Sequence, residues 1–208
     1  MKLYDDVLPA PNPRRVRIFL AEKGLKIPLE RVALVEGKHK SSEYLKKNTL
    51  GQVPTLELDD GSTISESVSI CRYLEALHPT PALFGGTPKE QALIDMWIRR
   101  SDLRLMTPIG QVWVNAHPLT KRIMEAQGVK RFEEFGEANK ERSFGVMRWL
   151  DKDLGTRSFI AGDAYSMADI VTLCTLDFAK FIDLPIPENC KNLRAWHERV
   201  SARPSANA

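Results

Sequence analysis

The chain lacks the long hydrophobic run that a membrane-spanning helix requires. No stretch approaches the roughly 18 uninterrupted apolar residues of such a span. The start of the chain, where Met1 is followed by Lys2 and a short strand-like segment, does not have the pattern of a secretory signal peptide. We therefore expect a cytoplasmic protein with no membrane partner.

Cysteine is scarce, and neither sign of charge is in large excess. The three cysteines, Cys71, Cys174 and Cys190, are an odd number at wide spacing, which suits neither a disulfide framework nor a zinc site. The 30 basic and 27 acidic residues leave a net charge of only +3, with no basic block. We expect a reducing compartment, no metal and no nucleic-acid partner.

The 208 residues have the composition of a globular protein, with room for one large domain or two small ones. Short β-rich runs alternate with helical patterns up to about Pro79, and beyond Pro88 the pattern is almost entirely helical. Prolines and glycines fill the stretch between them. We predict a domain over residues 1–79, a linker over 80–88 in which Leu83 and Phe84 pack against a domain, and a helical domain over 89–208.

The first half predicts a strand-helix-strand unit followed by a hairpin and a helix. Asn12 is a candidate N-cap of the first helix, and Gly24 is its expected C-terminal stop. This order is the thioredoxin-like arrangement, with a right-handed parallel crossover. The predicted strands cover residues 2–6, 31–35, 55–60 and 62–65, and the predicted helices cover 13–23, 41–47 and 66–77.

The second half predicts helices over residues 88–115, 119–154, 167–181 and 193–202. Gly128 and Gly136 are candidate breaks in the second of them. Ser166 and Asp169 fit a capping box at the start of the third. The expected fold class is α/β plus all-α, with an N-terminal thioredoxin-like domain followed by a C-terminal helical-bundle domain.

Two motifs of the first half point to a peptide-like ligand. Pro54 in the Gly-Gln-Val-Pro run at 51–54 marks a strand start, an edge or a cis bond, and a cis bond would turn the Val53 backbone outward. Glu66 and Ser67 open a helix whose N-terminal N–H groups favour a carboxylate, with Glu66 beside it for an ammonium group. The alternative is that Pro54 only starts a strand and that Glu66 lies in an ordinary helix cap.

The same motifs carry a family resemblance. They are Asn-Thr-Leu-Gly-Gln-Val-Pro-Thr-Leu at 48–56 and Ser-Glu-Ser-Val-Ser-Ile-Cys-Arg-Tyr-Leu at 65–74, with the capping box at 166–169. The chain resembles the cytosolic glutathione S-transferases, in particular theta-like and nu-like members of the bacterial kind. The resemblance spans both halves and implies glutathione as co-substrate, a small electrophilic or disulfide second substrate, and a homodimer.

The resemblance also implies positions for the parts of glutathione. The backbone of Val53, beside cis-Pro54, would pair with the cysteinyl part, and residues 66–67 would hold the γ-glutamyl amine and carboxylate. His39 matches a position that contacts the glycyl carboxylate, and Gln52 would lie on the same side. A solvated loop is the alternative for His39.

The usual donor to the glutathione sulfur is missing. No hydroxyl or thiol side chain lies between Asp6 and Pro13, and Ala10 falls where theta-like members have serine. The Pro-Asn pair ending at Asn12 resembles the nu class, in which an asparagine contacts the sulfur. Two readings stay open for Asn12, a catalytic donor or a helix cap, and Tyr4 is a further candidate that lies too early in the first strand.

The second-substrate pocket is expected along the helix predicted at 88–115, from Met106, Gln111 and Trp113. The alternative is a core role, which a Met and a Trp at helical spacing have more often. The leading hypothesis is a glutathione transferase that activates glutathione as a thiolate. Its rivals are a disulfide reductase or peroxidase that uses bound glutathione as its thiol, and a weakly catalytic or non-catalytic binding protein on the same scaffold.

Overall fold

The computed structural model describes residues 1–6 and 10–208. By their contacts these residues form two compact units: a first unit of Met1–Gly86 with Arg203–Ala208, and a second unit of Thr87–Ala202. The sequence analysis placed residues 203–208 in the helical domain, whereas their contacts place them with the first unit. Among the described residues, no helix has both the length and the apolar character needed to cross a membrane.

The first unit contains a mixed four-stranded sheet with the strand order β2-β1-β3-β4. The pair β1–β2 is parallel, whereas β1–β3 and β3–β4 are antiparallel, so Leu3 lies opposite Leu29 on one side and Leu56 on the other. This is the predicted thioredoxin-like arrangement, which is confirmed. The strands are β1 (Lys2–Asp5), β2 (Leu29–Arg31), β3 (Thr55–Glu57) and β4 (Thr63–Ser65).

The prediction of the second strand was wrong in its position. The strand covers Leu29–Arg31, and Leu34–Glu36 forms a 3-10 turn instead of continuing it. The buried carboxylate of Asp6 explains the change, because it accepts a hydrogen bond from the Leu34 N–H at 2.8 Å and so draws the backbone away from the sheet. A prediction from local strand propensity cannot detect a hydrogen-bond acceptor that lies far away in the sequence.

The first helix, α1 (Pro11–Lys23), begins two residues earlier than predicted. Ala10 is its N-cap residue, so the prediction that Asn12 caps the helix was wrong. Pro11 and Pro13 both fit in the first turn, since the N–H groups that they lack would have no acceptor inside the helix. The helix ends at Gly24 in the left-handed conformation, as predicted.

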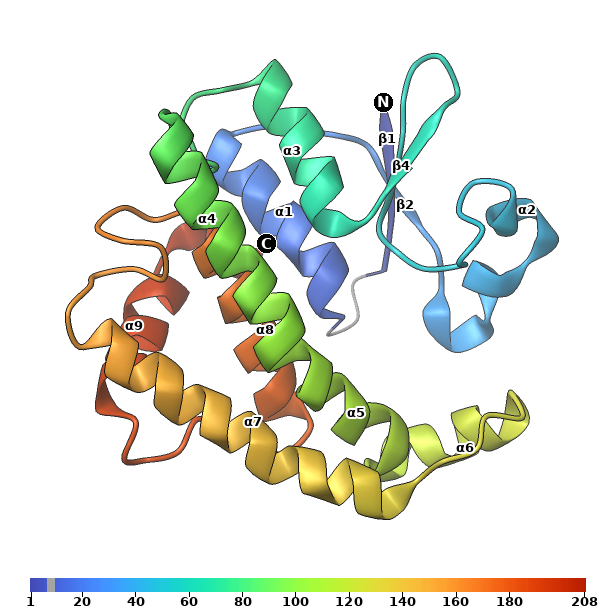
Figure 1. Ribbon diagram of the computed structural model, residues 1–208. Coiled ribbons are helices and arrows are strands. Elements are labelled where there is room, and N and C mark those ends of the chain that lie inside the picture. The colour runs from blue at the N-terminus through green and yellow to red at the C-terminus, as the bar shows by residue number, and fades with distance from the viewer. Residues whose placement is uncertain (7–9) are drawn as a thin grey trace. The chain divides into compact units, whose positions relative to one another are not determined.

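Helices α1 and α3 (Ser67–Leu77) pack together against one face of the sheet (Figure 1). Neighbouring residues of a strand point to opposite faces, so Leu3 and Tyr4 belong to different packing layers. The helix-covered layer is fully buried and includes Leu3, Ile18, Phe19, Leu56, Ile70 and Leu74. On the other face Tyr4 joins Val32, Tyr44 and Val53 in a smaller cluster, in which Tyr44 comes from the short helix α2 (Ser42–Leu45).

The segment after α3 packs against the first unit. As predicted, Leu83 and Phe84 are buried, and the Phe84 ring lies 6.1 Å from that of Phe19. The Lys23 ammonium, fully buried, donates to the backbone oxygens of His78 and Pro81. These residues are therefore held against α1 rather than forming a free tether.

The C-terminal 3-10 helix Pro204–Asn207 also packs on α1. The Arg203 guanidinium makes two hydrogen bonds to the Glu22 carboxylate at 2.8 and 2.7 Å, and Ser205 donates to the same carboxylate. Arg14 donates to the backbone oxygen of Ala206 at 2.9 Å. The end of the chain is thus tied to α1 along its length.

The second unit is helical (Figure 1). Its first helical stretch runs through residues 88–115 as predicted, but with a π-helical segment in the middle, where Pro108 cannot donate to the turn before it. The elements are α4 (Pro88–Arg100), the π segment Ser101–Met106, α5 (Thr107–Asn115), α6 (Pro118–Ala126), α7 (Glu133–Leu154), α8 (Met167–Phe181) and α9 (Lys191–Ser201).

The predicted break in the second long helix occurs at Gly128 and not at Gly136. Gly128 has φ +66° just after α6, whereas Gly136 lies inside α7. A Cβ atom at Gly136 would lie 2.6 Å from the Cβ of Ala116. This glycine therefore permits close packing of α7 on the end of α5 rather than breaking the helix.

Helix α8 forms the buried centre of the second unit and begins at the predicted capping box of Ser166 and Asp169. The Asp169 carboxylate accepts hydrogen bonds from the N–H groups of Ser166 and Ile160 and from the Trp196 indole, each at 2.9 Å. Burial raises the pKa of Asp169, while these donors oppose the shift. The Asp169 side chain thus joins the start of α8 to Trp196 of α9 and to Ile160 in the loop that precedes α8.

Candidate functional site

A small surface pocket in the first unit gathers most of the residues that the sequence singled out. It lies where three segments meet, namely the start of α1, the loop at 48–54 and the start of α3. His39 is not among its lining residues, and Asn48 is one that the sequence analysis gave no role. The lining residues are Asn12, Asn48, Gln52, Val53, Pro54, Glu66 and Ser67.

The start of α1 offers an unusual set of donors. Pro11 and Pro13 have no backbone N–H group, so the first turn of the helix offers the backbone N–H of Asn12. The side chain of Asn12 adds an amide group to this donor. Asn12 is half-buried and lines the pocket. Because Ala10 occupies the cap position, the amide oxygen of Asn12 has no capping role.

The loop at 48–54 presents backbone to the pocket. The Val53–Pro54 bond is cis, as the sequence suggested, and β3 begins directly after it at Thr55. Val53 itself is buried. Within the described part of the chain, no hydrogen bond is made by the N–H or the C=O of Val53. With respect to the described residues, the N–H and C=O of Val53 are thus open to a ligand.

Gly51 brings a neighbouring turn against this loop. It has φ +57°, and a Cβ atom there would lie 2.6 Å from the backbone oxygen of His39. His39 belongs to the 3-10 turn Lys38–Lys40, and Lys40 donates to the Leu50 oxygen at 2.9 Å. Burial, helped by the charge of Lys40, lowers the pKa of His39, so its imidazole is neutral near pH 7. His39 therefore flanks the loop that holds Gln52.

The start of α3 forms the third wall. Glu66 is exposed and has φ +68°, an uncommon value for a residue with a side chain. It holds the N-cap position, and Ser67, which is buried, is the first helical residue. The first N–H groups of a helix lack intrahelical acceptors and carry a partial positive charge. Backbone N–H groups that are suited to a carboxylate therefore lie beside a negatively charged side chain.

Asn48 acts on the loop from inside. Its side-chain amide donates to the backbone oxygen of Gln52 at 2.9 Å, and its side-chain oxygen accepts from the Leu50 N–H at 3.1 Å. With both ends engaged, Asn48 shapes the loop. The sequence contains a signal for this turn, because asparagine and glycine both favour turns and Asn48 lies three residues before Gly51.

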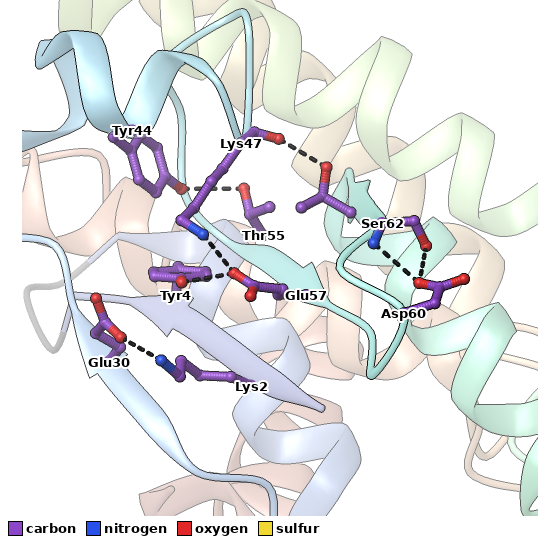
Figure 2. Close-up of polar contacts among 10 residues, drawn as sticks. Lys2, Tyr4, Glu30, Tyr44, Lys47, Thr55, Glu57, Asp60 and Ser62 are labelled. Carbon is purple, nitrogen blue, oxygen red and sulfur yellow. Dashed lines mark hydrogen bonds and ion pairs between the residues drawn. The ribbon is translucent and has the colours of Figure 1, made fainter.

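Tyr4 does not serve the pocket. Its hydroxyl donates to Glu57 at 2.6 Å, Lys47 pairs with the same carboxylate, and Figure 2 shows this group together with the Lys2–Glu30 pair. Burial and the bond to Glu57 raise the pKa of Tyr4. The phenol is thus protonated and engaged elsewhere.

The three cysteines are free thiols and all are buried. No CxxC pair occurs in the sequence. Among the described residues, no group of His, Cys, Asp and Glu could hold a metal ion. The side chains that line the pocket carry amide, carboxylate and hydroxyl groups.

The residues predicted for a second-substrate pocket lie in the second unit. The Trp113 ring packs against those of Phe178 and Phe181, at 5.5 and 6.1 Å. The Gln111 side-chain oxygen accepts from the Asn115 amide at 3.0 Å, and Met106 is half-buried at the end of the π segment. Their role toward a substrate stays a prediction.

Comparison with known families shows which family the fold belongs to. The family model of the glutathione S-transferase N-terminal domain matches residues 10–77, and that of the glutathione S-transferase C-terminal domain matches residues 115–204. The chain belongs to the glutathione S-transferase family. The pocket thus lies in the N-terminal domain of a glutathione S-transferase.

Characterised relatives agree over nearly the full length. The chain is 40% identical to glutathione S-transferase 2 of Saccharomyces cerevisiae, over 99% of this chain and 87% of that protein. It is 31% identical to human glutathione S-transferase theta-2B, over 97% of this chain and 81% of that protein. The predicted family is confirmed.

Solved structures give the same result. The crystal structure of Gtt2 from Saccharomyces cerevisiae superposes with a TM-score of 0.92 at 39% identity, covering 100% of this chain and 99% of that one. A glutathione S-transferase domain-containing protein of Marinobacter aquaeolei also has a TM-score of 0.92, at 37% identity, with 99% of each chain covered. The two-part glutathione S-transferase fold is thus shared throughout.

Proposed function

We propose that this protein is a glutathione transferase that binds glutathione in the pocket of the first unit and activates it as a thiolate. The observation that carries the proposal is the pocket itself, which combines a backbone slot at Val53, a helix N-terminus at Ser67 and an amide donor at Asn12. Glutathione has a matching peptide backbone, an amino acid head and a thiol. The carboxylate of Glu66 suits the ammonium group of that head.

The same arrangement supports assignments for each part of the ligand. The backbone of Val53 beside Pro54 pairs with the cysteinyl part, and the γ-glutamyl carboxylate binds at the N–H groups that begin at Ser67. Gln52, which is exposed, and His39 lie toward the glycyl carboxylate. With these contacts made, the sulfur lies toward the start of α1.

Activation requires that the pKa of the glutathione thiol be lowered by a moderate amount. A free thiol has a pKa near 8.5, so only about 3% is thiolate at pH 7. Lowering that pKa by two units takes about 2.7 kcal/mol of preferential stabilisation of the anion. Two donors from Asn12, its N–H and its side-chain amide, together with the positive end of α1 supply an effect of that size.

The activated thiolate attacks a small electrophile, and the sulfur–carbon bond forms as the leaving group departs. A second candidate is glutathione-dependent disulfide reduction, in which bound glutathione supplies the thiol. The burial of all three protein cysteines favours this form of exchange over one that uses a protein thiol. Met106, Gln111 and Trp113 are proposed for the second-substrate pocket, and a cytoplasmic homodimer is the proposed assembly.

The test is a pH titration of the thiolate absorbance of glutathione bound to the wild type, to Asn12→Ala and to Asn12→Asp. We expect a pKa well below 8.5 in the wild type and a rise of about one unit in Asn12→Ala. Asn12→Asp keeps the shape but places a negative charge beside the sulfur, so the pKa should rise further. Turnover of a chloronitrobenzene electrophile should fall in the same order.

Two outcomes would contradict the proposal. Absence of glutathione binding by the wild type would remove the enzymatic role altogether. Binding with an unshifted thiol pKa would instead indicate a non-catalytic glutathione-binding protein. An unchanged pKa in both variants would exclude Asn12 from the mechanism while leaving the transferase activity in place.

A further inference from the structure

The backbone oxygen of Gln52 is the centre of a buried hydrogen-bond group. The Tyr44 hydroxyl donates to it at 2.7 Å and the Asn48 amide at 2.9 Å. The Thr55 hydroxyl lies 3.0 Å from the Tyr44 hydroxyl and 3.2 Å from the Asn48 amide nitrogen. Tyr44, Asn48 and Thr55 are all buried.

The shortest contacts give a consistent assignment of the protons. Tyr44 has a single hydroxyl proton, and its 2.7 Å bond to the Gln52 oxygen uses it, so Thr55 is the donor in its 3.0 Å contact with Tyr44. The Thr55 hydroxyl also lies 3.4 Å from the Gln52 oxygen and can share its proton with it. The two protons of the Asn48 amide then go to the Gln52 oxygen and to Thr55. The two lone pairs of the Gln52 oxygen are filled. Burial raises the pKa of Tyr44, which keeps this donor protonated.

The anchored oxygen fixes the direction of the next N–H. The Gln52 C=O and the Val53 N–H belong to one planar peptide unit, and in a trans unit they point in opposite directions. Because the C=O points inward to Tyr44 and Asn48, the Val53 N–H points away from them. Val53 lines the pocket.

Tyr44 is itself braced by the sheet. Its ring makes an edge contact with that of Tyr4, with 5.9 Å between centroids. The hydroxyl of Tyr4 donates instead to Glu57, at 2.6 Å (Figure 2). Of these two neighbouring tyrosines, Tyr44 donates to the Gln52 oxygen and Tyr4 donates to Glu57.

We infer that Tyr44 is a positioning residue, which with Asn48 and Thr55 aims the Val53 N–H at the peptide of bound glutathione. This inference rests on the proposed function. Tyr44 touches neither the thiol nor the ligand. Its loss should weaken binding of the peptide and leave the pKa of the bound thiol as it is in the wild type.

The experiment compares Tyr44→Phe with Tyr4→Phe in the full chain, using glutathione as the probe. We expect Tyr44→Phe to raise the Kd of glutathione by about fivefold and Tyr4→Phe to change it by less than twofold. Amide hydrogen exchange of Val53, followed by NMR, should slow on glutathione binding in the wild type and in Tyr4→Phe. In Tyr44→Phe this protection should be largely lost.

Equal Kd values for the two variants, or full protection of Val53 in Tyr44→Phe, would overturn the inference. If Tyr44→Phe does not fold, Thr55→Val provides the same test by removing the donor to Tyr44, with a smaller increase in Kd. A wild type that binds no glutathione contradicts the proposed function instead. A wild type that binds glutathione while the variants match it contradicts the positioning role alone.

Discussion

Glu66 combines a strained backbone with a proposed role in glutathione binding. Its φ of +68° lies in a region that residues with side chains seldom adopt, and such conformations cost about 1–3 kcal/mol. The same conformation lets β4 end at Ser65 and α3 begin at Ser67 with the Glu66 carboxylate exposed beside the pocket. The backbone strain therefore lies beside the proposed glutathione pocket.

A pair of substitutions separates the two effects. Glu66→Gly should raise the free energy of unfolding by about 1 kcal/mol, because relief of strain exceeds the added flexibility of glycine. Glu66→Gln keeps the strain and should leave the stability unchanged. Both should weaken glutathione binding by about fivefold or more, since both remove the charge that pairs with the ammonium group.

The measurements are chemical denaturation and calorimetric titration with glutathione. N-acetylated glutathione, which has no ammonium group, provides the control ligand: the wild type should prefer glutathione over it, and the two variants should not. Equal stability of Glu66→Gly and wild type would show that the backbone is not strained at this position.

At the residue scale the sequence predicted which residues lie together in one pocket where a backbone motif determines their position. Val53, Pro54, Glu66 and Ser67 lie together, because a proline before a strand and a polar pair before a helix are local signals. Asn12 was placed correctly beside the pocket but wrongly at the helix cap. Pro11 and Pro13 are both tolerated in a first turn, and a pattern with two prolines does not reveal which one starts the helix.

Among the elements, α7 illustrates how two glycines in one helix can have opposite roles. Gly136 lies where α7 meets the end of α5, with the Ala116 Cβ only 2.6 Å from the place that a Cβ of its own would occupy. Gly145 lies in the same helix, and the atom nearest to the place that its Cβ would occupy is a flexible Arg148 nitrogen at 3.8 Å. One glycine is needed for packing, and the other is not.

Substitution by alanine should therefore change stability in opposite directions. Gly136→Ala should destabilise the protein by about 1–3 kcal/mol, since α5 and α7 must move apart. Gly145→Ala should stabilise it by up to about 1 kcal/mol through helix propensity. Thermal unfolding of the two variants beside the wild type measures both effects, and a stabilising Gly136→Ala would contradict the close contact.

The elements also show where sequence patterns fail. The capping box at Ser166 and Asp169 and the stop at Gly24 were predicted because their signals are local. The second strand was misplaced because the buried carboxylate of Asp6 redirects the chain, and the role of Gly136 was missed because Ala116 is its neighbour only in space.

At the scale of the whole molecule, Glu22 of α1 is joined to the C-terminal segment by hydrogen bonds from Arg203 and Ser205, and we call this contact the clamp. Burial alone would raise the pKa of Glu22, but the bonds from Arg203 and Ser205 outweigh it, and the net pKa is lowered. A carboxyl group whose pKa is lower in the folded state adds stability above its ordinary pKa of about 4.3. That stability is lost as the pH falls through the folded value.

Glu22→Gln should accordingly lower the free energy of unfolding by about 2 kcal/mol at pH 7. The difference from the wild type should shrink as the pH falls below about 4, where the wild-type carboxyl becomes protonated. Denaturation across this pH range tests the expectation, with Glu125→Gln, an exposed change on α6, as the control. A difference that persists unchanged at low pH would assign the effect to packing rather than to charge.

The same clamp has a consequence for synthesis on the ribosome. The strands and helices of the first unit are made early, whereas Arg203 and Ser205 follow the entire second unit. Domains generally fold in the order in which they emerge, yet this unit is complete only when its last segment has been made. A nascent chain that stops before Arg203 carries α1 with Glu22 lacking both of its donors. Prematurely terminated products therefore expose this surface of α1 to the cell's quality-control machinery, even when every residue of the glutathione pocket has been made.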